Sequence, residues 1–332
     1  MSGSASVQPT RASWASAAAW RGMFRDRPIV PLVGLLALMI VVIRIVQPDI
    51  ISPGWVGVTF RAAIPLAILA ACQTLTFLTG GIDLSVGAVA SMSGFMVATL
   101  VGHQGLAVAL LVPLVIAAIA GAVTGVGVGV FRVHPLIMTL GMSLVVLGLA
   151  NVWQLIMVQT GGGVPPDLRT LGSATVGGIL PYSLLVFVPV AALILFLLRG
   201  TGYGRLLYAI GDNPIASRLS GVRSWQVLVV LYSLSAVLAA IAGFLYSGLT
   251  NVASVSLVDT AVLPSVAAAV IGGTSIMGGR GGFSGTIVGV LILTVLTSLL
   301  SSLGYPEAVR QILFGAIIVA VAAAYTRVTA ES

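Results

Sequence analysis

Long apolar stretches are the feature of this sequence that most limits its fold. The segment 226–250, for example, contains no charged side chain. An α-helix needs about 20 apolar residues to cross the hydrocarbon core of a bilayer, whereas strands of a membrane β-barrel alternate in polarity over about ten residues. Only 7% of the residues are charged, against about 25% in soluble domains. The sequence therefore predicts an all-α fold, namely a polytopic membrane helical bundle.

The apolar stretches predict about ten transmembrane spans, by the length that a bilayer requires. They define a membrane domain over residues 28–327, preceded by a tail at 1–27. The third and eighth spans are short, so we expect them to be re-entrant or broken helices. The predicted spans lie at residues 28–47, 57–80, 86–101, 105–131, 135–158, 180–199, 226–250, 262–277, 282–304 and 307–326.

The placement of arginine predicts how these spans are oriented. All 15 basic residues are arginine, and cytoplasmic loops of membrane proteins are enriched in basic residues. With both termini in the cytoplasm, most of the arginines fall on the inner side. Membrane topology therefore explains the net charge of +7, and no nucleic acid is expected as a partner. The predicted inner arginines are Arg11, Arg21, Arg25, Arg27, Arg132, Arg199, Arg205, Arg218, Arg223, Arg280 and Arg327, and the outer ones are Arg44, Arg61, Arg169 and Arg310.

The cytoplasmic tail at 1–27 leaves two interpretations open. Trp20 and Phe24 are four residues apart, beside Arg21 and Arg25, a spacing that suits a helix lying in the membrane interface. A tail without regular structure is the alternative. A cleaved signal peptide is not expected, because no small-residue cleavage site follows a short apolar core.

The segment LTGGIDLSVG, residues 78–87, places Asp83 between two apolar stretches. A charge at the centre of a bilayer costs about 2.5–3.5 kcal/mol on insertion scales. Gly80 and Gly81 can end one helix in backbone conformations closed to other residues, and Asp83 can then cap the next helix, with Ser85 sharing the donors. A structural cap at a helix break is one interpretation. The other places the break on a transport pathway, where Asp83 pairs with another group or contacts the solute.

The segment 199–223 is the longest predicted cytoplasmic loop, and it contains two short helix patterns. Two helical turns at 203–210 are expected to end at Gly211. A second helix at 215–220 follows, with Asn213 as its N-cap. These helices are predicted to form a docking surface on the cytoplasmic face. A loop that only rests on lipid headgroups is the alternative.

The residue types present exclude several functions. Without lysine the chain has no P-loop for ATP, because that motif requires lysine, and it has no Schiff-base lysine. The single cysteine, Cys72, can build neither an internal disulfide nor a zinc site. Motifs of zinc proteases and serine hydrolases are absent, which argues against an intramembrane enzyme. An ion-coupled secondary transporter is the alternative from another class. It usually needs buried acid or histidine relays, whereas His103 and His134 lie at span ends and Asp83 has no obvious partner. No metal or cofactor is expected.

Glycine patterns predict how the helices pack. Stripes of small residues four apart let membrane helices approach closely, and two such stripes occur. Residues 69–95 also faintly echo 266–290, which leaves open an inverted repeat of spans 2–5 and 7–10, an arrangement common in transporters. The stripes are formed by Gly121, Gly125 and Gly129, and by Gly285 and Gly289.

Four sequence blocks extend over nearly the whole chain in a fixed order. They are LTGGIDLSVGAVASMSG (78–94), HPLIMTLGMSLVVLGLA (134–150), GRLLYAIGDNPIASRLSGV (204–222) and AAAVIGGTSIMGGRGGFSGTIVGV (267–290). Together they resemble the permease subunit of ribose-type sugar ABC importers. The resemblance implies a permease of the bacterial inner membrane that moves a monosaccharide, or a related neutral sugar or polyol, and is not itself an enzyme.

The resemblance and the patterns above predict two groups of functional residues. The first group couples the permease to an ATPase, and the second forms a helix break or the translocation pathway. The coupling residues are Gly204, Arg205, Ala209, Gly211, Asn213, Ala216, Arg218 and Gly221, and the break or pathway residues are Gly80, Gly81, Asp83, Ser85, Gly87, Thr274 and Ser275.

The resemblance also implies three partners. These are a cytoplasmic ABC ATPase with two nucleotide-binding domains, a periplasmic or lipid-anchored sugar-binding protein, and a second permease copy. The sequence departs from the family at SLVDTAVLPSVA, where Asp259 stands without the glutamate that family members often carry. The particular sugar therefore stays open. Sister permeases for nucleosides, autoinducer-like furanosyl compounds or branched-chain amino acids are the alternatives.

Overall fold

The computed structural model describes residues 29–157 and 163–330, with side chains up to Val319. The predicted tail at 1–27 lies outside these residues. The predicted all-α class is confirmed. The described residues also contain two strands of two residues each, β1 (Thr175–Val176) and β2 (Leu180–Pro181). The helices are α2 (Ile29–Val46), α3 (Pro53–Phe77), α4 (Val86–Gly129), α5 (Pro135–Met157), α6 (Pro166–Ser173), α7 (Leu184–Gly200), α8 (Gly202–Asp212), α9 (Pro214–Leu219), α10 (Ser224–Thr250), η2 (Asp259–Ala261), α11 (Val262–Ile271), α12 (Phe283–Ser302) and α13 (Glu307–Ala330).

Six helices in the described part of the chain are long and apolar enough to cross a membrane, namely α2, α3, α4, α5, α10 and α12. The pair α7 and α8, bent by 69°, makes a seventh candidate. Helix α11 has only 10 residues, which extend about 15 Å, half of a hydrocarbon core of about 30 Å. It corresponds to the eighth predicted span, which was expected to be a broken helix.

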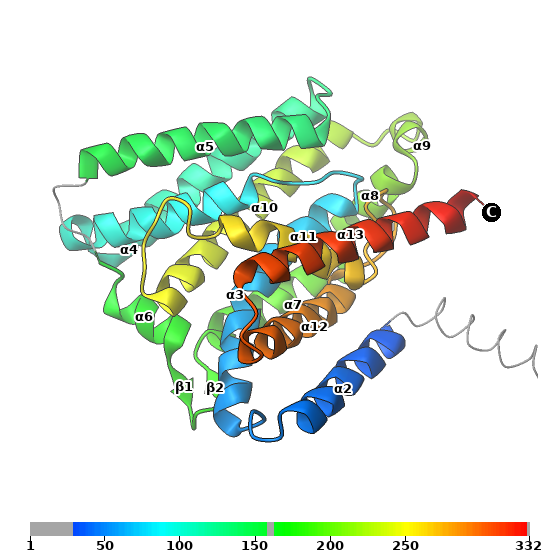
Figure 1. The fold of residues 1–332 in the computed structure, drawn as a ribbon. Helices are drawn as coiled ribbons and strands as arrows, with labels where there is room; N and C mark the ends of the chain where they lie inside the picture. The colour runs from blue at the N-terminus through cyan, green and yellow to red at the C-terminus, as the bar shows by residue number, and fades with distance from the viewer. Residues whose placement is uncertain (1–28, 158–162, 331–332) are drawn as a thin grey trace, which may run out of the picture.

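Helix α4 contains two of the predicted spans. Its 44 residues would extend about 66 Å as one straight helix, twice the thickness of the hydrocarbon core. Gly105 has a non-helical backbone, with φ 75° and ψ 165°. Met92 and Ala117, on opposite sides of Gly105, line the same small cavity. The chain therefore turns back at Gly105, and the two halves of α4 lie side by side (Figure 1).

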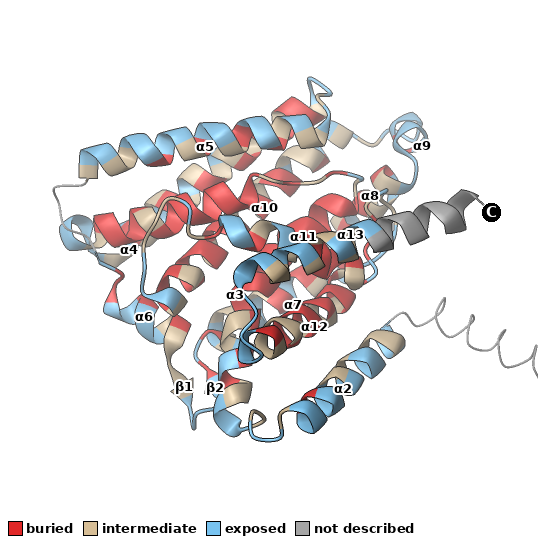
Figure 2. Cartoon of the chain, viewed as in Figure 1, coloured by how far each residue is buried: buried red, intermediate tan, exposed pale blue. Residues whose placement is uncertain are grey.

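Helices α3 and α10 form the centre of the bundle. In each of these two helices, 61% of the most apolar 18-residue stretch is buried, against 6% in α2. Figure 2 shows buried residues concentrated on α3, α10 and α12, and exposed residues along α2 and α5. Helix α5 packs on α4 and directs Leu144 and Leu155 outward. In a polytopic membrane protein these outward apolar side chains face lipid.

Both predicted glycine stripes lie at close helix contacts. A Cβ atom added at Gly121 or Gly125 would overlap the backbone of α10. A Cβ atom added at Gly285 or Gly289 would overlap backbone oxygens of Gly272 and Ala268, respectively, at α11. The stripes therefore let α4 approach α10, and α12 approach α11, as the spacing of small residues predicts.

Gly243 in α10 offers a test of this close packing. A Cβ atom there would overlap the carbonyl group of Ala90 in α4, and overpacking a dense contact typically costs about 1–3 kcal/mol. We expect Gly243→Ala to lower the midpoint of thermal unfolding in detergent, measured by tryptophan fluorescence. Gly148→Ala on α5 is the matched control, because no atom lies within 4 Å of its added Cβ. Equal midpoints for the two variants would contradict the contact.

The two ends of the bundle differ in structure. One end, here named the α6 face, carries α6 and the β1–β2 hairpin, in which Val176 pairs with Leu180. Arg61 of α3 donates a hydrogen bond to the carbonyl oxygen of Ser173 at the end of α6. The other end, the α8–α9 face, comprises α8, α9 and the connections 130–134 and 272–282 (Figure 1).

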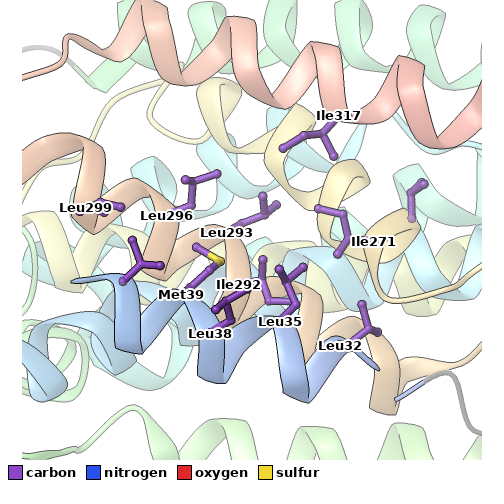
Figure 3. A pocket seen from close by; sticks show the side chains of 12 residues that line it. Leu32, Leu35, Leu38, Met39, Ile271, Ile292, Leu293, Leu296, Leu299 and Ile317 are labelled. Carbon is purple, nitrogen blue, oxygen red and sulfur yellow. The ribbon is translucent and has the colours of Figure 1, made fainter. Parts of the chain in front are cut away.

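Helix α2 packs on α12 at the edge of the bundle. A groove of about 580 Å³ lies between α2, α11, α12 and α13. Figure 3 shows that it is lined by apolar side chains alone, among them Leu35, Met39, Ile292 and Ile317. Such a lining suits hydrocarbon rather than a polar solute, so this groove is no candidate for a translocation pathway.

Candidate functional site

Asp83 lies in the break between α3 and α4 and is only 2% exposed. Its Oδ1 atom accepts hydrogen bonds from the amide and hydroxyl groups of Ser85, at 3.0 and 2.6 Å. Its Oδ2 atom accepts one from the hydroxyl group of Ser235 in α10, at 2.9 Å. The carboxylate therefore holds the turn at Ser85, the N-cap residue of α4, and links that turn to α10. This geometry supports a structural role at the helix break, while contact with solute stays a prediction.

Further hydrogen bonds hold this first break in place. The Gln73 amide donates to the carbonyl oxygen of Asp83 at 2.7 Å, and the Thr139 hydroxyl donates to that of Ile82 at 3.1 Å. Gly80 has a φ of 74°, a conformation that costs glycine little. Buried backbone groups need such partners at membrane depth. The irregular segment is therefore fixed from α3 and α5 as well as from α10.

A second break, residues 272–282, separates α11 from α12 and contains the predicted pathway residues Thr274 and Ser275. Both are buried. The amide of Ser275 donates to the carbonyl oxygen of Arg280 at 3.0 Å, and the Thr274 hydroxyl accepts from the amide of Gly282 at 3.4 Å. The Ser275 hydroxyl accepts from the amide of Met277 at 3.2 Å. Both side chains therefore bond to backbone within the break, while contact with solute stays a prediction.

The predicted short helices of 199–223 are present as α8 and α9. Thr201 caps α8, because its hydroxyl accepts from the amide of Gly204 at 3.2 Å. The Asn213 side chain caps α9 by accepting from the amides of Ile215 and Ala216, at 3.1 and 2.9 Å. The predicted end of the first helix at Gly211 is wrong, since α8 continues to Asp212.

Gly211 has a different role, because it lies where three segments meet. A Cβ atom at Gly211 would overlap the carbonyl oxygen of Leu78, just past α3, and the amide of Gly279 in the second break. That amide donates to the Leu78 carbonyl oxygen at 3.0 Å. The Tyr208 hydroxyl donates to the carbonyl oxygen of Gly281 at 2.9 Å. Helix α8 thus rests directly on both breaks, and we name this contact the α8 junction.

The remaining predicted residues occupy different places. Gly204 packs on α7, since a Cβ atom there would overlap the carbonyl oxygen of Leu198. Gly81 lies against the Tyr232 hydroxyl, and Gly87 lies away from the junction, against Val262 at the start of α11. Gly221 follows α9 with a φ of 84°. The exposed members of the coupling group are Arg205, Ala209, Asn213, Ala216, Arg218 and Gly221.

Three residues of the site were missed at the sequence level. Ser235 holds Asp83, and Tyr232 lies one helical turn before it beside Gly81. The buried thiol of Cys72 donates to the carbonyl oxygen of Ser235 at 3.2 Å. The spacing of Tyr232 and Ser235, which places both on one face of a helix, was the available signal.

The arrangement can transmit motion. Helices α8 and α9 present exposed polar residues at one end of the bundle, and backbone contacts at the α8 junction connect them to the ends of α3 and α11. Packed backbone is stiff, so force on α8 reaches both breaks. Hinges that absorb such motion lie at the ends of helices.

Comparison of the sequence with known proteins finds import permeases. The chain is 37% identical to the ribose import permease protein RbsC of Escherichia coli K12 over 261 residues, 76% of this chain and 79% of the relative. It is 33% identical to the fructose import permease protein FrcC of Rhizobium meliloti over 76% of this chain and 72% of that protein. The autoinducer 2 import system permease protein LsrC of Escherichia coli O9:H4 is 30% identical over 86% and 85%. No solved structure matches the chain.

A family model described as the permease component of branched-chain amino acid transport systems matches residues 57–322. That range extends from the first turns of α3 into α13 and includes both breaks and the α8 junction. The match covers most of the chain, and the curated relatives agree with it over most of their own length. This multi-pass membrane protein therefore belongs to the family of permease components of branched-chain amino acid transport systems, which includes the ribose-type permeases.

Proposed function

We propose that the chain is the permease subunit of an ATP-driven ABC importer that moves a monosaccharide, or a related neutral sugar or polyol, across the bacterial inner membrane. The α8 junction is the observation that carries this proposal. It places a short capped helix at one end of the bundle, in backbone contact with both helix breaks. The names of the ribose and fructose import permeases support the choice of substrate class.

The proposed orientation places the α8–α9 face in the cytoplasm, with both termini on that side. Arg199 and Arg280 belong to this end, where Arg199 donates to Ser284 at 2.9 Å, and Arg132, Arg218 and Arg223 surround one pocket there. Arg61 contacts the α6 face. This distribution follows the predicted bias of arginine toward the cytoplasm.

The proposed division of labour assigns ATP hydrolysis to a separate cytoplasmic ATPase with two nucleotide-binding domains. A chain without lysine cannot supply the P-loop lysine itself. The ATPase would dock on the coupling residues of α8 and α9. A periplasmic or lipid-anchored sugar-binding protein would dock on the α6 face, and a second permease copy would complete the pathway.

The proposed mechanism follows from the contacts. Closure of the ATPase moves α8, and the α8 junction passes the displacement to the end of α3 and to the second break. Asp83 keeps the start of α4 attached to α10 through Ser235, so these helices move together. The break residues Gly80, Gly81, Asp83, Ser85, Thr274 and Ser275 form the joints of this movement, and Gly87 seats α4 on α11.

One of the comparisons supports a second substrate class. The autoinducer 2 permease is nearly as similar as the sugar permeases, so a furanosyl compound of that kind is the alternative cargo. Buried side chains that are polar but uncharged, such as Gln73 and Ser247, suit either cargo, because neutral hydroxyl and amide groups bind a polyol without fixed charge.

Reconstitution tests the proposed function. We expect liposomes containing the purified chain alone to show no uptake of labelled sugar against a gradient, with or without ATP. Addition of a cognate ATPase and binding protein should give ATP-dependent accumulation of one solute from a panel of ribose, fructose and autoinducer 2. Accumulation by the chain alone would overturn the proposal and favour an ion-coupled transporter.

A further inference from the structure

A pocket of about 290 Å³ with both polar and apolar lining residues opens at the α8–α9 face. It lies between the end of α4, the α8–α9 pair and the start of α10. Three arginines line it, each from a different segment, and none of the lining residues is acidic. We name this hollow the arginine pocket. Its lining comprises Thr79, Val128, Gly129, Arg132, Pro135, Ile210, Pro214, Arg218, Val222, Arg223, Ser224, Trp225, Leu228 and Tyr232.

The three arginines have no carboxylate partner within the described residues, where the salt bridge between Arg310 and Glu307 is the one found. Arg132, Arg218 and Arg223 are exposed and line the pocket. Guanidinium groups beside a space without counter-charge suit a phosphate, which they match in planar, two-point geometry.

The backbone of Arg132 strengthens this assignment. Its φ is 56°, and among described non-glycine residues only Asn251 shares a positive φ. A left-handed conformation costs a residue with a Cβ atom about 1–2 kcal/mol, and such outliers are typical of ligand sites. The conformation turns the chain between α4 and α5 at a residue that lines the pocket.

Two unused hydroxyl groups lie deeper in the same pocket. The Tyr232 side chain is 1% exposed, and its hydroxyl has no hydrogen-bond partner. The Ser224 hydroxyl, in the first turn of α10, is also buried without a partner. Buried polar groups normally have partners. Both residues line the pocket, so an acceptor bound there could complete their hydrogen bonding once the side chains turn toward it, and the start of α10 adds a favourable helix dipole.

The surroundings indicate where the phosphate comes from. Trp225 lines the pocket. Phe131 precedes Arg132 in the chain and is 75% exposed. Exposed aromatic residues next to basic ones mark the headgroup level of a bilayer. We propose that the arginine pocket binds the phosphodiester headgroup of an anionic phospholipid. This proposal goes beyond the proposed function and does not depend on it.

The test uses the purified full chain in a neutral detergent with phosphatidylglycerol as the probe. Native mass spectrometry and lipid titration give the number and affinity of retained lipids. The double variant Arg132→Gln/Arg223→Gln should bind phosphatidylglycerol about 25-fold more weakly, because one basic residue near a membrane contributes about fivefold. Arg169→Gln, in α6 at the other end, removes a charge as the control and should leave the affinity unchanged.

A second variant keeps the proposal testable if the double variant fails to fold. Tyr232→Phe removes only the unpartnered hydroxyl and should weaken lipid binding several-fold without lowering thermal stability in phosphatidylcholine. Equal lipid affinity in wild type, the arginine variants and the control would overturn the proposal. So would displacement by equimolar inorganic phosphate, which would identify a free-phosphate site. The proposal would also be overturned if the arginine variants kept their lipid affinity and weakened only the binding of the ATPase, because the arginines would then pair with acidic residues of that partner.

Discussion

Gly211→Ala is expected to reduce uptake at least tenfold in the assembled importer. The added Cβ atom would overlap the Leu78 carbonyl oxygen and the Gly279 amide. Both are backbone groups and cannot move aside alone, so the cost reaches or exceeds the usual 1–3 kcal/mol of overpacking. The change pushes α8 away from both breaks and removes the contact through which force would pass. ATP-dependent uptake in liposomes measures the effect.

Gly202→Ala in the same helix is the matched control for this experiment. Its added Cβ atom would meet only the end of the Arg205 side chain, at 3.6 Å, an ordinary contact. Uptake should stay near the wild-type level. ATPase activity of the complex separates coupling from assembly, because a loss of coupling leaves hydrolysis while transport fails. Wild-type uptake by Gly211→Ala would show that the α8 junction carries no force.

Asp83→Ala is expected to have the second large effect, a loss of folded protein. Removal of the carboxylate leaves the Ser85 amide and the hydroxyls of Ser85 and Ser235 buried without their acceptor. Each buried unsatisfied group costs about 1–3 kcal/mol, which is comparable with a total folding stability of about 5–15 kcal/mol. Thermal unfolding in detergent and the yield of monodisperse protein measure the loss.

Asp83→Asn distinguishes the cap from a role in binding solute. The amide keeps one acceptor oxygen, so it retains part of the cap and should recover much of the stability lost in Asp83→Ala. Under the capping interpretation, uptake follows the amount of folded protein in both variants. A variant that is as stable as wild type and yet does not transport would place Asp83 on the pathway and contradict a purely structural cap.

Helix positions and local caps were predictable because they depend on neighbours in sequence. Apolar stretches of about 20 residues indicated the membrane segments, and Asn213 with the following proline indicated the start of α9. The stripe of Gly121, Gly125 and Gly129 predicted a close helix contact. The sequence did not identify α10 as the partner helix, because the stripe records only the small size of its own side chains.

The details of the site depend on contacts that sequence spacing does not reveal. Ser235 reaches Asp83 across 152 residues. The spacing of Tyr232 and Ser235 places both on one face of α10, but it does not indicate which acceptor that face meets. Gly211 illustrates the same limit. A glycine near the end of a helix pattern favours a helix stop, but here the same small residue permits close backbone contact inside α8, and that tertiary contact decided the outcome.

The position of Cys72 has a practical consequence for experiments on this chain. Its thiol is fully buried and donates to backbone oxygens of Ile68 and Ser235, and reagents need an accessible thiolate. The chain also contains no lysine. The wild-type protein should therefore react little with thiol-reactive dyes. Cysteines introduced at Gly202 and Asn251 would then report separately on the two ends of the bundle during transport.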